Sequence, residues 1–165
     1  MTVQAANAEE RKTIWEAMLD TEQAARYWGK IAYRLQTRDK LCGYLAFLLT
    51  IAAALTVGLR VEWWAQFGTT LLTAVVTGIT IFYRFGRSAE QAAQLHRLNA
   101  EASLQYQSMW NRLHELDASA VRGAHETIQR SLIVAGSASV REFREDRALA
   151  AKAQQEVLQQ RGLGS

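Results

Sequence analysis

The sequence predicts an all-α membrane protein, in which a two-helix transmembrane hairpin carries long cytoplasmic helical extensions that pack as an antiparallel bundle. Proline is absent from the 165 residues, so little interrupts a helix. Two runs without charge, residues 41–59 and 63–83, are each long enough to cross a bilayer. The segments before and after these runs repeat apolar residues at helical spacing. Together these observations favour helices throughout the chain.

Residues 8–40 are predicted to form a cytoplasmic amphipathic helix. Apolar and small residues recur there at intervals of three and four, which indicates one seam along a helix. The seam consists of Ile14, Met18, Thr21, Ala25, Trp28, Ala32 and Leu35. Because an apolar stripe on a helix normally faces a core, we expect another helix to pack against it.

Residues 41–59 and 63–83 are predicted to be transmembrane helices 1 and 2. At about 1.5 Å per residue they extend about 28 to 31 Å, which matches the hydrocarbon thickness of a bilayer. Residues 60–62 form the predicted external turn, because an ionised side chain at mid-bilayer costs at least about 2.5 kcal/mol. A hydrophobic hairpin inside a soluble core is the alternative. A signal peptide is disfavoured, because the first run begins only at Leu41.

Positive charges flank the two runs on one side. They are Arg26, Lys30, Arg34, Arg38 and Lys40 before the first run, and Arg84 and Arg87 after the second. The turn offers only Arg60. Since the cytoplasmic flanks of membrane helices are enriched in lysine and arginine, both termini are expected in the cytoplasm.

Residues 84–116 are predicted to form a second cytoplasmic helix with a matching apolar stripe. The stripe consists of Leu95, Leu98, Ala102, Tyr106, Met109, Leu113, Leu116 and Ala120. Antiparallel pairing with the seam of residues 8–40 is the simplest arrangement, because the short turn already sets the membrane helices antiparallel. Trp28 and Trp110 are expected in the shared core as helix-packing residues.

Residues 117–161 are predicted to be a C-terminal helical region. Asp117 or Ser119 can cap a new helix, and Gly136 and Ser137 suggest a break after it. A terminal helix is expected over residues 140–158, with an apolar stripe too thin for a core of its own. This helix either docks on the body of the protein or pairs with another subunit, which makes the region a candidate for oligomerisation.

No enzyme, cofactor or metal site is predicted. The single cysteine, Cys42, excludes an intrachain disulfide and a cysteine-rich zinc site. His96, His114 and His125 lie too far apart along a helix to share a metal, so a surface or packing role is expected. The motifs of phosphate-binding loops, nucleophile elbows and zinc proteases are absent. Lysine and arginine exceed aspartate and glutamate by only 19 to 16, without a basic patch, which argues against nucleic acid as a partner.

A polar line on the second apolar run carries the strongest functional signal. Its members recur every three or four residues and are Gln66, Thr70, Thr73, Thr77, Thr80 and Arg84. In one interpretation the threonines bond back to their own helix, and the line packs on a small-residue face of the first run. That face consists of Gly43, Ala46, Thr50, Ala53 and Val57. In the other interpretation the line consists of pore-lining residues, which face the lumen of a ring of hairpins. We favour packing, because small and polar residues are the usual contacts between membrane helices.

Two stretches of the chain resemble a known family. They are ARYWGKIAYRLQTRDK, residues 25–40, and AEQAAQLHRLNAEASLQYQSMWNRL, residues 89–113, on either side of the apolar runs. Over residues 10–115 the chain resembles the SLATT family, bacterial two-transmembrane proteins with a cytoplasmic helical region. The resemblance rests on the position of the hairpin and on Trp28, Lys30, Arg34, His96 and Tyr106.

The resemblance implies a pore-forming effector of bacterial conflict or anti-phage defence in the inner membrane, with a nucleotide-signalling or sensor protein as upstream partner. We therefore expect a homo-oligomer in the lipid bilayer that forms a pore or disrupts the membrane when triggered through its cytoplasmic helices. The alternative is a non-conducting membrane anchor or scaffold that clusters a soluble signalling partner.

Overall fold

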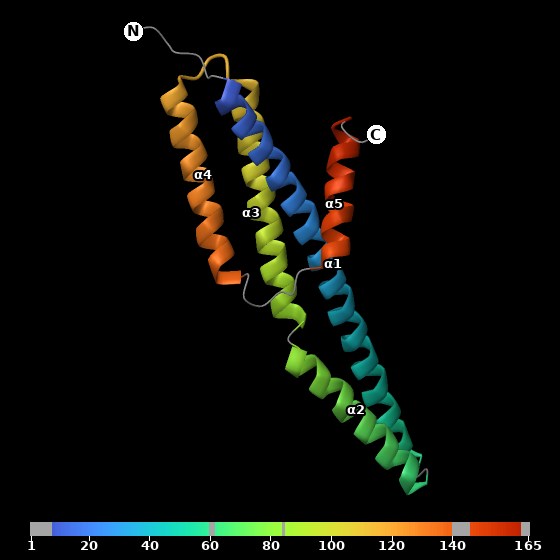
Figure 1. The fold of residues 1–165 in the computed structure, drawn as a ribbon. Coiled ribbons are helices and arrows are strands. Elements are labelled where there is room, and N and C mark those ends of the chain that lie inside the picture. The colour runs from blue at the N-terminus through green and yellow to red at the C-terminus, as the bar shows by residue number, and fades with distance from the viewer. Residues whose placement is uncertain (1–7, 60–61, 84, 140–145, 163–165) are drawn as a thin grey trace. The chain divides into compact units, whose positions relative to one another are not determined.

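The structure is a computed structural model that describes residues 8–59, 62–83, 85–139 and 146–162. Over these residues it consists of five α-helices and no strand (Figure 1). They are α1 (Ala8–Gly58), α2 (Trp63–Tyr83), α3 (Phe85–Asn111), α4 (Ala118–Ser139) and α5 (Arg147–Gln160). The predicted all-helical class is therefore confirmed.

The chain divides into two compact units. Unit 1 comprises Met1–Ile31 and Gln91–Ser165, and unit 2 comprises Ala32–Glu90. Helices α1 and α3 contribute residues to both units.

Helix α1 runs without interruption through the two segments expected as residues 8–40 and 41–59. Glu9 and Glu10 lie in its first turn, where carboxylates favour the positive end of the helix dipole. The helix ends at Gly58, and α2 begins directly after Glu62, whose carbonyl accepts from the amide of Ala65 at 3.0 Å. Of the expected turn, residues 60 and 61 lie outside the described part of the chain.

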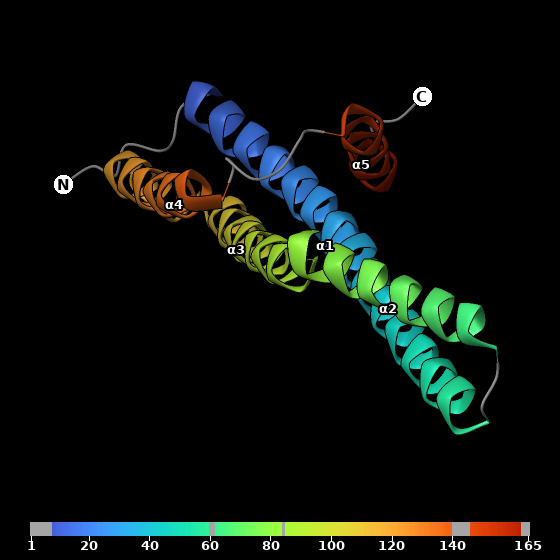
Figure 2. The ribbon, with the colours of Figure 1, turned by 90° about the horizontal axis from the view of Figure 1, so that it is seen from below.

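Unit 1 has an apolar core between α1, α3 and α4, which lie side by side in Figures 1 and 2. The buried cluster consists of Ile14, Ala17 and Met18 from α1, Ala102, Tyr106, Met109 and Leu113 from α3, and Val121 and Ile128 from α4. Most of these α1 and α3 residues belong to the two stripes that the sequence pattern identifies. The pattern did not show α4 as the third contributor, because its buried positions are few.

The predicted place of Trp28 in this core is wrong, and Trp15 takes it. Trp110 packs against the buried cluster and stacks on Trp15, with ring centroids 5.1 Å apart. Nearer the other end of the same helix pair, the His96 ring contacts the carbonyl of Ala25 at 2.7 Å. Contacts along α1 and α3 therefore run in opposite order, and Trp28 lies at the level of His96, far along the helix from Trp110.

Helix α4 begins after Asp117, whose carbonyl accepts from the amide of Val121 at 3.0 Å. The predicted break at Gly136 and Ser137 is wrong, because α4 continues through both to Ser139. A single glycine costs a helix only about 1 kcal/mol, which the other turns of α4 outweigh. Residues 140–145, the start of the expected terminal helix, lie outside the described part of the chain.

Helix α5 docks on the part of α1 that belongs to unit 1. Asp146 caps α5, because its carboxylate accepts from the amide of Leu149 at 3.1 Å. The amide of Asp146 in turn donates to the hydroxyl of Tyr27 at 3.1 Å. The apolar stripe of α5 is buried at Leu149, Ala153 and Val157. We expected the terminal helix either to dock on the body of the protein or to pair with another subunit, and in the structure α5 docks on α1.

Over the part of unit 2 that the structure describes, no apolar core of comparable size is present. Among its described residues, Ala89 is the one that is buried. Its large apolar side chains point outward instead, including Leu41, Phe47 and Leu48 on α1 and Trp63 and Phe67 on α2.

Candidate functional site

The α1–α2 contact within unit 2 is made by polar side chains near Thr56. The hydroxyls of Thr56 and Thr69 lie 3.5 Å apart, and the side-chain amide of Gln66 donates to the carbonyl of Thr56 at 3.4 Å. Thr56 also donates to the carbonyl of Ala53 at 2.8 Å. Gln66 thus contacts α1, as the packing interpretation requires of the polar line. The sequence pattern missed Thr56 and Thr69 as its partners.

Beyond Gln66, the polar line on α2 includes both partly buried and exposed side chains. Thr73 is partly buried and donates to the carbonyl of Thr69 at 2.8 Å. Thr70 is exposed and donates to the carbonyl of Gln66 at 2.8 Å. Thr77 is exposed as well. Because the bonds of Thr70 and Thr73 stay within α2, these hydroxyls need no further partner in an apolar environment. Arg84, and the side chain of Thr80, lie outside what the structure describes.

The small residues of α1 face α2 only in part. Ala46 and Ala53 are partly buried, whereas Gly43 and Thr50 are exposed. A Cβ atom on Gly43 would meet no atom within 4 Å. Thr50 donates to the carbonyl of Ala46 at 2.8 Å, so its hydroxyl is also satisfied within the helix. Gly43 and Thr50 therefore leave an open strip beside the α1–α2 contact.

One stretch within α1 is long and apolar enough to cross a membrane, judged by length and composition over the described helices. Its mean hydropathy is 1.8, and none of it is buried. A core helix of a soluble protein passes the same test of composition but is buried, which this stretch is not. The exposure of the stretch fits association with a membrane.

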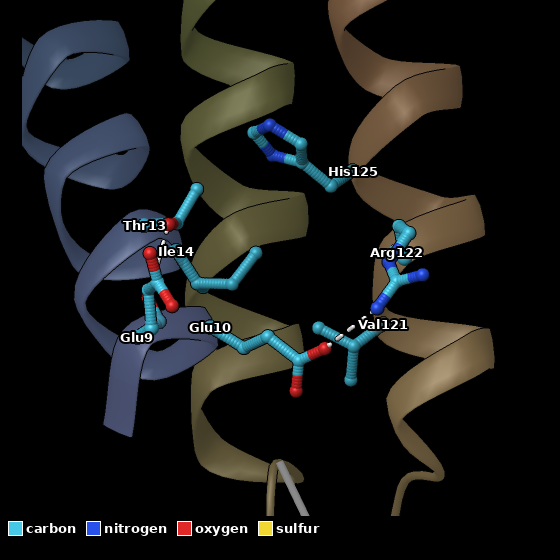
Figure 3. Close-up of a pocket in the computed structure, with 7 residues that line it drawn as sticks. All are labelled: Glu9, Glu10, Thr13, Ile14, Val121, Arg122 and His125. Carbon is cyan, nitrogen blue, oxygen red and sulfur yellow. Dashed lines mark hydrogen bonds and ion pairs between the residues drawn. The ribbon is translucent and has the colours of Figure 1, made fainter. Parts of the chain in front are cut away.

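Unit 1 contains a cavity of about 310 Å³ between α1 and α4 (Figure 3). Ile14 and Val121 supply apolar lining, and Glu10 is paired with Arg122 across the cavity at 3.2 Å. The full lining is Glu9, Glu10, Thr13, Ile14, Val121, Arg122 and His125. Thr13 and His125 also line a neighbouring cavity of about 440 Å³, so the hollow continues along the two helices.

A hydrogen-bonded trio lies behind this cavity. The hydroxyl of the fully buried Tyr106 is 3.1 Å from Nδ1 of His125 and accepts from the side-chain amide of Gln129 at 3.4 Å. Burial raises the pKa of Tyr106, and the bond from Gln129 offsets part of that rise. The trio ties α3 to α4, and His125 is the member that also lines the cavity.

The remaining histidines also make local contacts. Nδ1 of His96 contacts the carbonyl of Ala25, and the ring lies so close to Gly29 that a Cβ atom there would approach Nδ1 to 3.1 Å. A side chain at position 29 would force the ring to move. His114 lies 3.5 Å from the carboxylate of Glu115. Over the described residues, no group of three or more histidine, cysteine or carboxylate side chains gathers as a metal site.

Ion pairs hold α5 against α1. Glu22 pairs with Arg26 at 2.9 Å on its own helix and with Arg161, just beyond α5, at 2.8 Å. Lys30 donates to Glu156 at 2.6 Å, and this bond lowers the pKa of the Glu156 carboxyl. The sequence pattern assigned Arg26 and Lys30 to the flank of the membrane helix. In the structure both are engaged by acidic side chains, with Glu156 more than a hundred positions away from Lys30.

Comparisons with family models, with curated proteins and with solved structures find no match to this chain.

Proposed function

We propose that the chain is an oligomeric membrane effector that inserts α1 and α2 as a transmembrane hairpin into a bacterial inner membrane. It forms a pore or disrupts the membrane when its cytoplasmic helices receive a signal. The observation that carries this proposal is the apolar surface of unit 2. Of the twenty large apolar side chains that are exposed among the described residues, sixteen lie between Leu41 and Ile79.

On α1 these side chains cover a broad face rather than a narrow stripe. At about 100° per residue, Tyr44, Leu45, Phe47 and Leu48 spread over roughly 160° of the helix circumference, and all four are exposed. An amphipathic helix on a soluble protein buries its apolar stripe and exposes polar residues. A helix that is apolar around most of its circumference is instead typical of a membrane span.

The free energies favour lipid over water as the surroundings of unit 2. Removing one large apolar side chain from water is worth about 1.5 to 3 kcal/mol. Sixteen partly exposed side chains therefore represent on the order of 10 to 40 kcal/mol, which exceeds the usual 5 to 15 kcal/mol stability of a whole domain. Lipid tails provide this environment without any further protein.

The exposed polar and small positions support an oligomer. Two spans cannot enclose a conduit, so a pore requires a ring of subunits. Gly43 and Thr50 on α1, and Thr70 and Thr77 on α2, are not covered within unit 2. Small and hydroxyl side chains are the usual contacts between membrane helices, and a row of hydroxyls suits an aqueous lumen. The resemblance to SLATT proteins adds the role of an effector and a nucleotide-signalling or sensor protein as its trigger.

Conductance of the reconstituted full chain tests the pore. We expect ion flux across liposomes, and we expect Thr70→Leu combined with Thr77→Leu to reduce it by about tenfold, since an apolar constriction excludes water. The two positions are seven residues apart and both exposed, so the change alters one face of α2.

The matched control replaces two exposed threonines elsewhere, Thr37→Leu with Thr127→Leu. Both hydroxyls bond to the carbonyl four residues earlier, as that of Thr70 does. Flux should survive in the control. Equal flux in the two double variants, with equal oligomeric state in detergent, would remove the lumen assignment.

A non-conducting scaffold is the second candidate, and the hollow between α1 and α4 favours it. Unit 1 has its own core beside this open, partly apolar surface, which suits a soluble partner. A scaffold would recruit such a partner and would cause no ion flux across liposomes at any protein density. A dimer in detergent would favour this function, because four spans are too few for a wide pore.

A further inference from the structure

The structure separates the cations near the apolar runs into two classes. Arg26 and Lys30 are paired with carboxylates, as described above. Arg38, Lys40 and Arg87 are exposed, and no ion pair to any of them is found within the described part of unit 2. Arg34 has an interaction of its own, so it does not belong to this second class. Among the described residues, these three cations therefore have no carboxylate partner in an ion pair.

These three cations come from two helices that meet at one point. A Cβ atom on Gly86 would lie 3.5 Å from Oδ2 of Asp39, so the start of α3 passes close beside α1 at this level. Arg38 and Lys40 flank Asp39 in sequence and therefore project to either side of it on α1, and Arg87 follows Gly86, so the three cations lie around this contact at one level of the helices. Counting Asp39, the cluster carries three positive charges and one negative charge. It attracts anions, and one carboxylate does not neutralise it.

The apolar surface starts where the cluster ends. Leu41 follows Lys40 directly, and Leu41, Tyr44 and Leu45 are exposed. A ligand that fits both features has an anionic head and long apolar chains. Exposed tyrosines suit the level of the headgroups, and Tyr33 and Tyr44 stand about one turn to either side of the cluster.

We infer that Arg38, Lys40 and Arg87 form a binding surface for the headgroups of anionic phospholipids. The inference rests on the proposed membrane insertion and adds a lipid preference to it. The cations lie at the membrane–water boundary, where they attract negative headgroups while the adjacent apolar residues contact the acyl chains. Zwitterionic phospholipids carry the same phosphate without net charge and gain less from the cluster.

The test uses the full chain in nanodiscs that contain phosphatidylcholine and phosphatidylglycerol in equal amounts. The protein is released in a mass spectrometer, and the lipids that remain bound are counted. We expect phosphatidylglycerol to be enriched, and the variant Arg38→Gln, Lys40→Gln, Arg87→Gln to lower that enrichment at least about fivefold. The control is Arg11→Gln, Arg130→Gln, Lys152→Gln, which removes the same residue types from exposed sites of unit 1. The control should keep the enrichment.

Raising the salt concentration from about 50 mM to about 500 mM should reduce the wild-type enrichment, because it shortens the Debye length. This second measurement requires no variant. A wild-type chain that floats with vesicles but binds the two lipids equally, or a cluster variant that matches the control, would overturn the lipid preference and leave the membrane proposal standing. A chain that does not float with vesicles at all would overturn both.

Discussion

Leu48→Lys distinguishes a lipid environment from an aqueous one through the size and direction of its effect. Leu48 is 60% exposed in the middle part of the apolar run of α1. At the centre of a membrane helix, lysine costs about 2.5 to 3.5 kcal/mol and leucine contributes about 0.3 to 0.6 kcal/mol in the opposite direction. The exchange should therefore disfavour insertion by about 3 to 4 kcal/mol, a factor on the order of 100 to 1,000.

The matched control is Leu104→Lys in unit 1, where the leucine is 63% exposed on α3. An exposed leucine in water can be replaced within about 0.5 kcal/mol, so the control should still insert. The assay is flotation of newly made chain with vesicles, followed by alkaline extraction. If Leu48→Lys floats as the control does, or if both chains stay soluble and helical without lipid, water surrounds Leu48 and the reasoning is refuted.

Two further substitutions test the packing of unit 1. Met18→Ala should lower the free energy of unfolding by about 2 to 5 kcal/mol, because Met18 is buried in the three-helix core. The control Leu104→Ala, at the surface, should change the free energy of unfolding by less than about 0.5 kcal/mol. Equal denaturation midpoints for the two variants would contradict the burial of Met18 in the core. The bond from Lys30 lowers the pKa of Glu156. The pair therefore stabilises the docking of α5 at any pH above the ordinary pKa of a glutamate, and this stabilisation is lost as the pH falls through the lowered pKa of Glu156. A spin label at the exposed Gln155 should gain mobility in acid, and in the variant Glu156→Gln it should have that mobility already at neutral pH. A spectrum that changes neither in acid nor in the variant would show that the Lys30–Glu156 pair does not hold α5 against α1.

Periodicity alone was sufficient to predict the helices, because an apolar residue every three or four positions is a local property. The stripe through Ile14 and Met18 and the stripe through Tyr106 and Met109 are both buried as expected. The continuity of α1 was not predictable in the same way. An amphipathic pattern and a uniformly apolar one meet near Lys40, and nothing in either pattern shows whether the backbone turns there.

The polar line on α2 was predictable as a line, but its partner was not. Spacing places Gln66, Thr70, Thr73 and Thr77 on one side of a helix, and α1 covers the edge of that side near Gln66 and Thr73. On a segment that is apolar all round, composition gives little information on which sector a neighbouring helix occupies. The face of α1 towards α2 includes Thr56, which spacing did not single out.

The sequence by itself determined that this protein is helical, where its charge-free runs lie and which stripes seek a core, because these depend on residues within a few turns of each other. The tertiary structure decided that α4 completes the core, that α5 docks on α1, and that Arg26 and Lys30 are paired, whereas no ion pair of Arg38 or Lys40 is found among the described residues. Those outcomes depend on contacts such as Lys30 with Glu156, 126 positions apart. Two side chains so distant in sequence meet only through the packing of the helices that carry them.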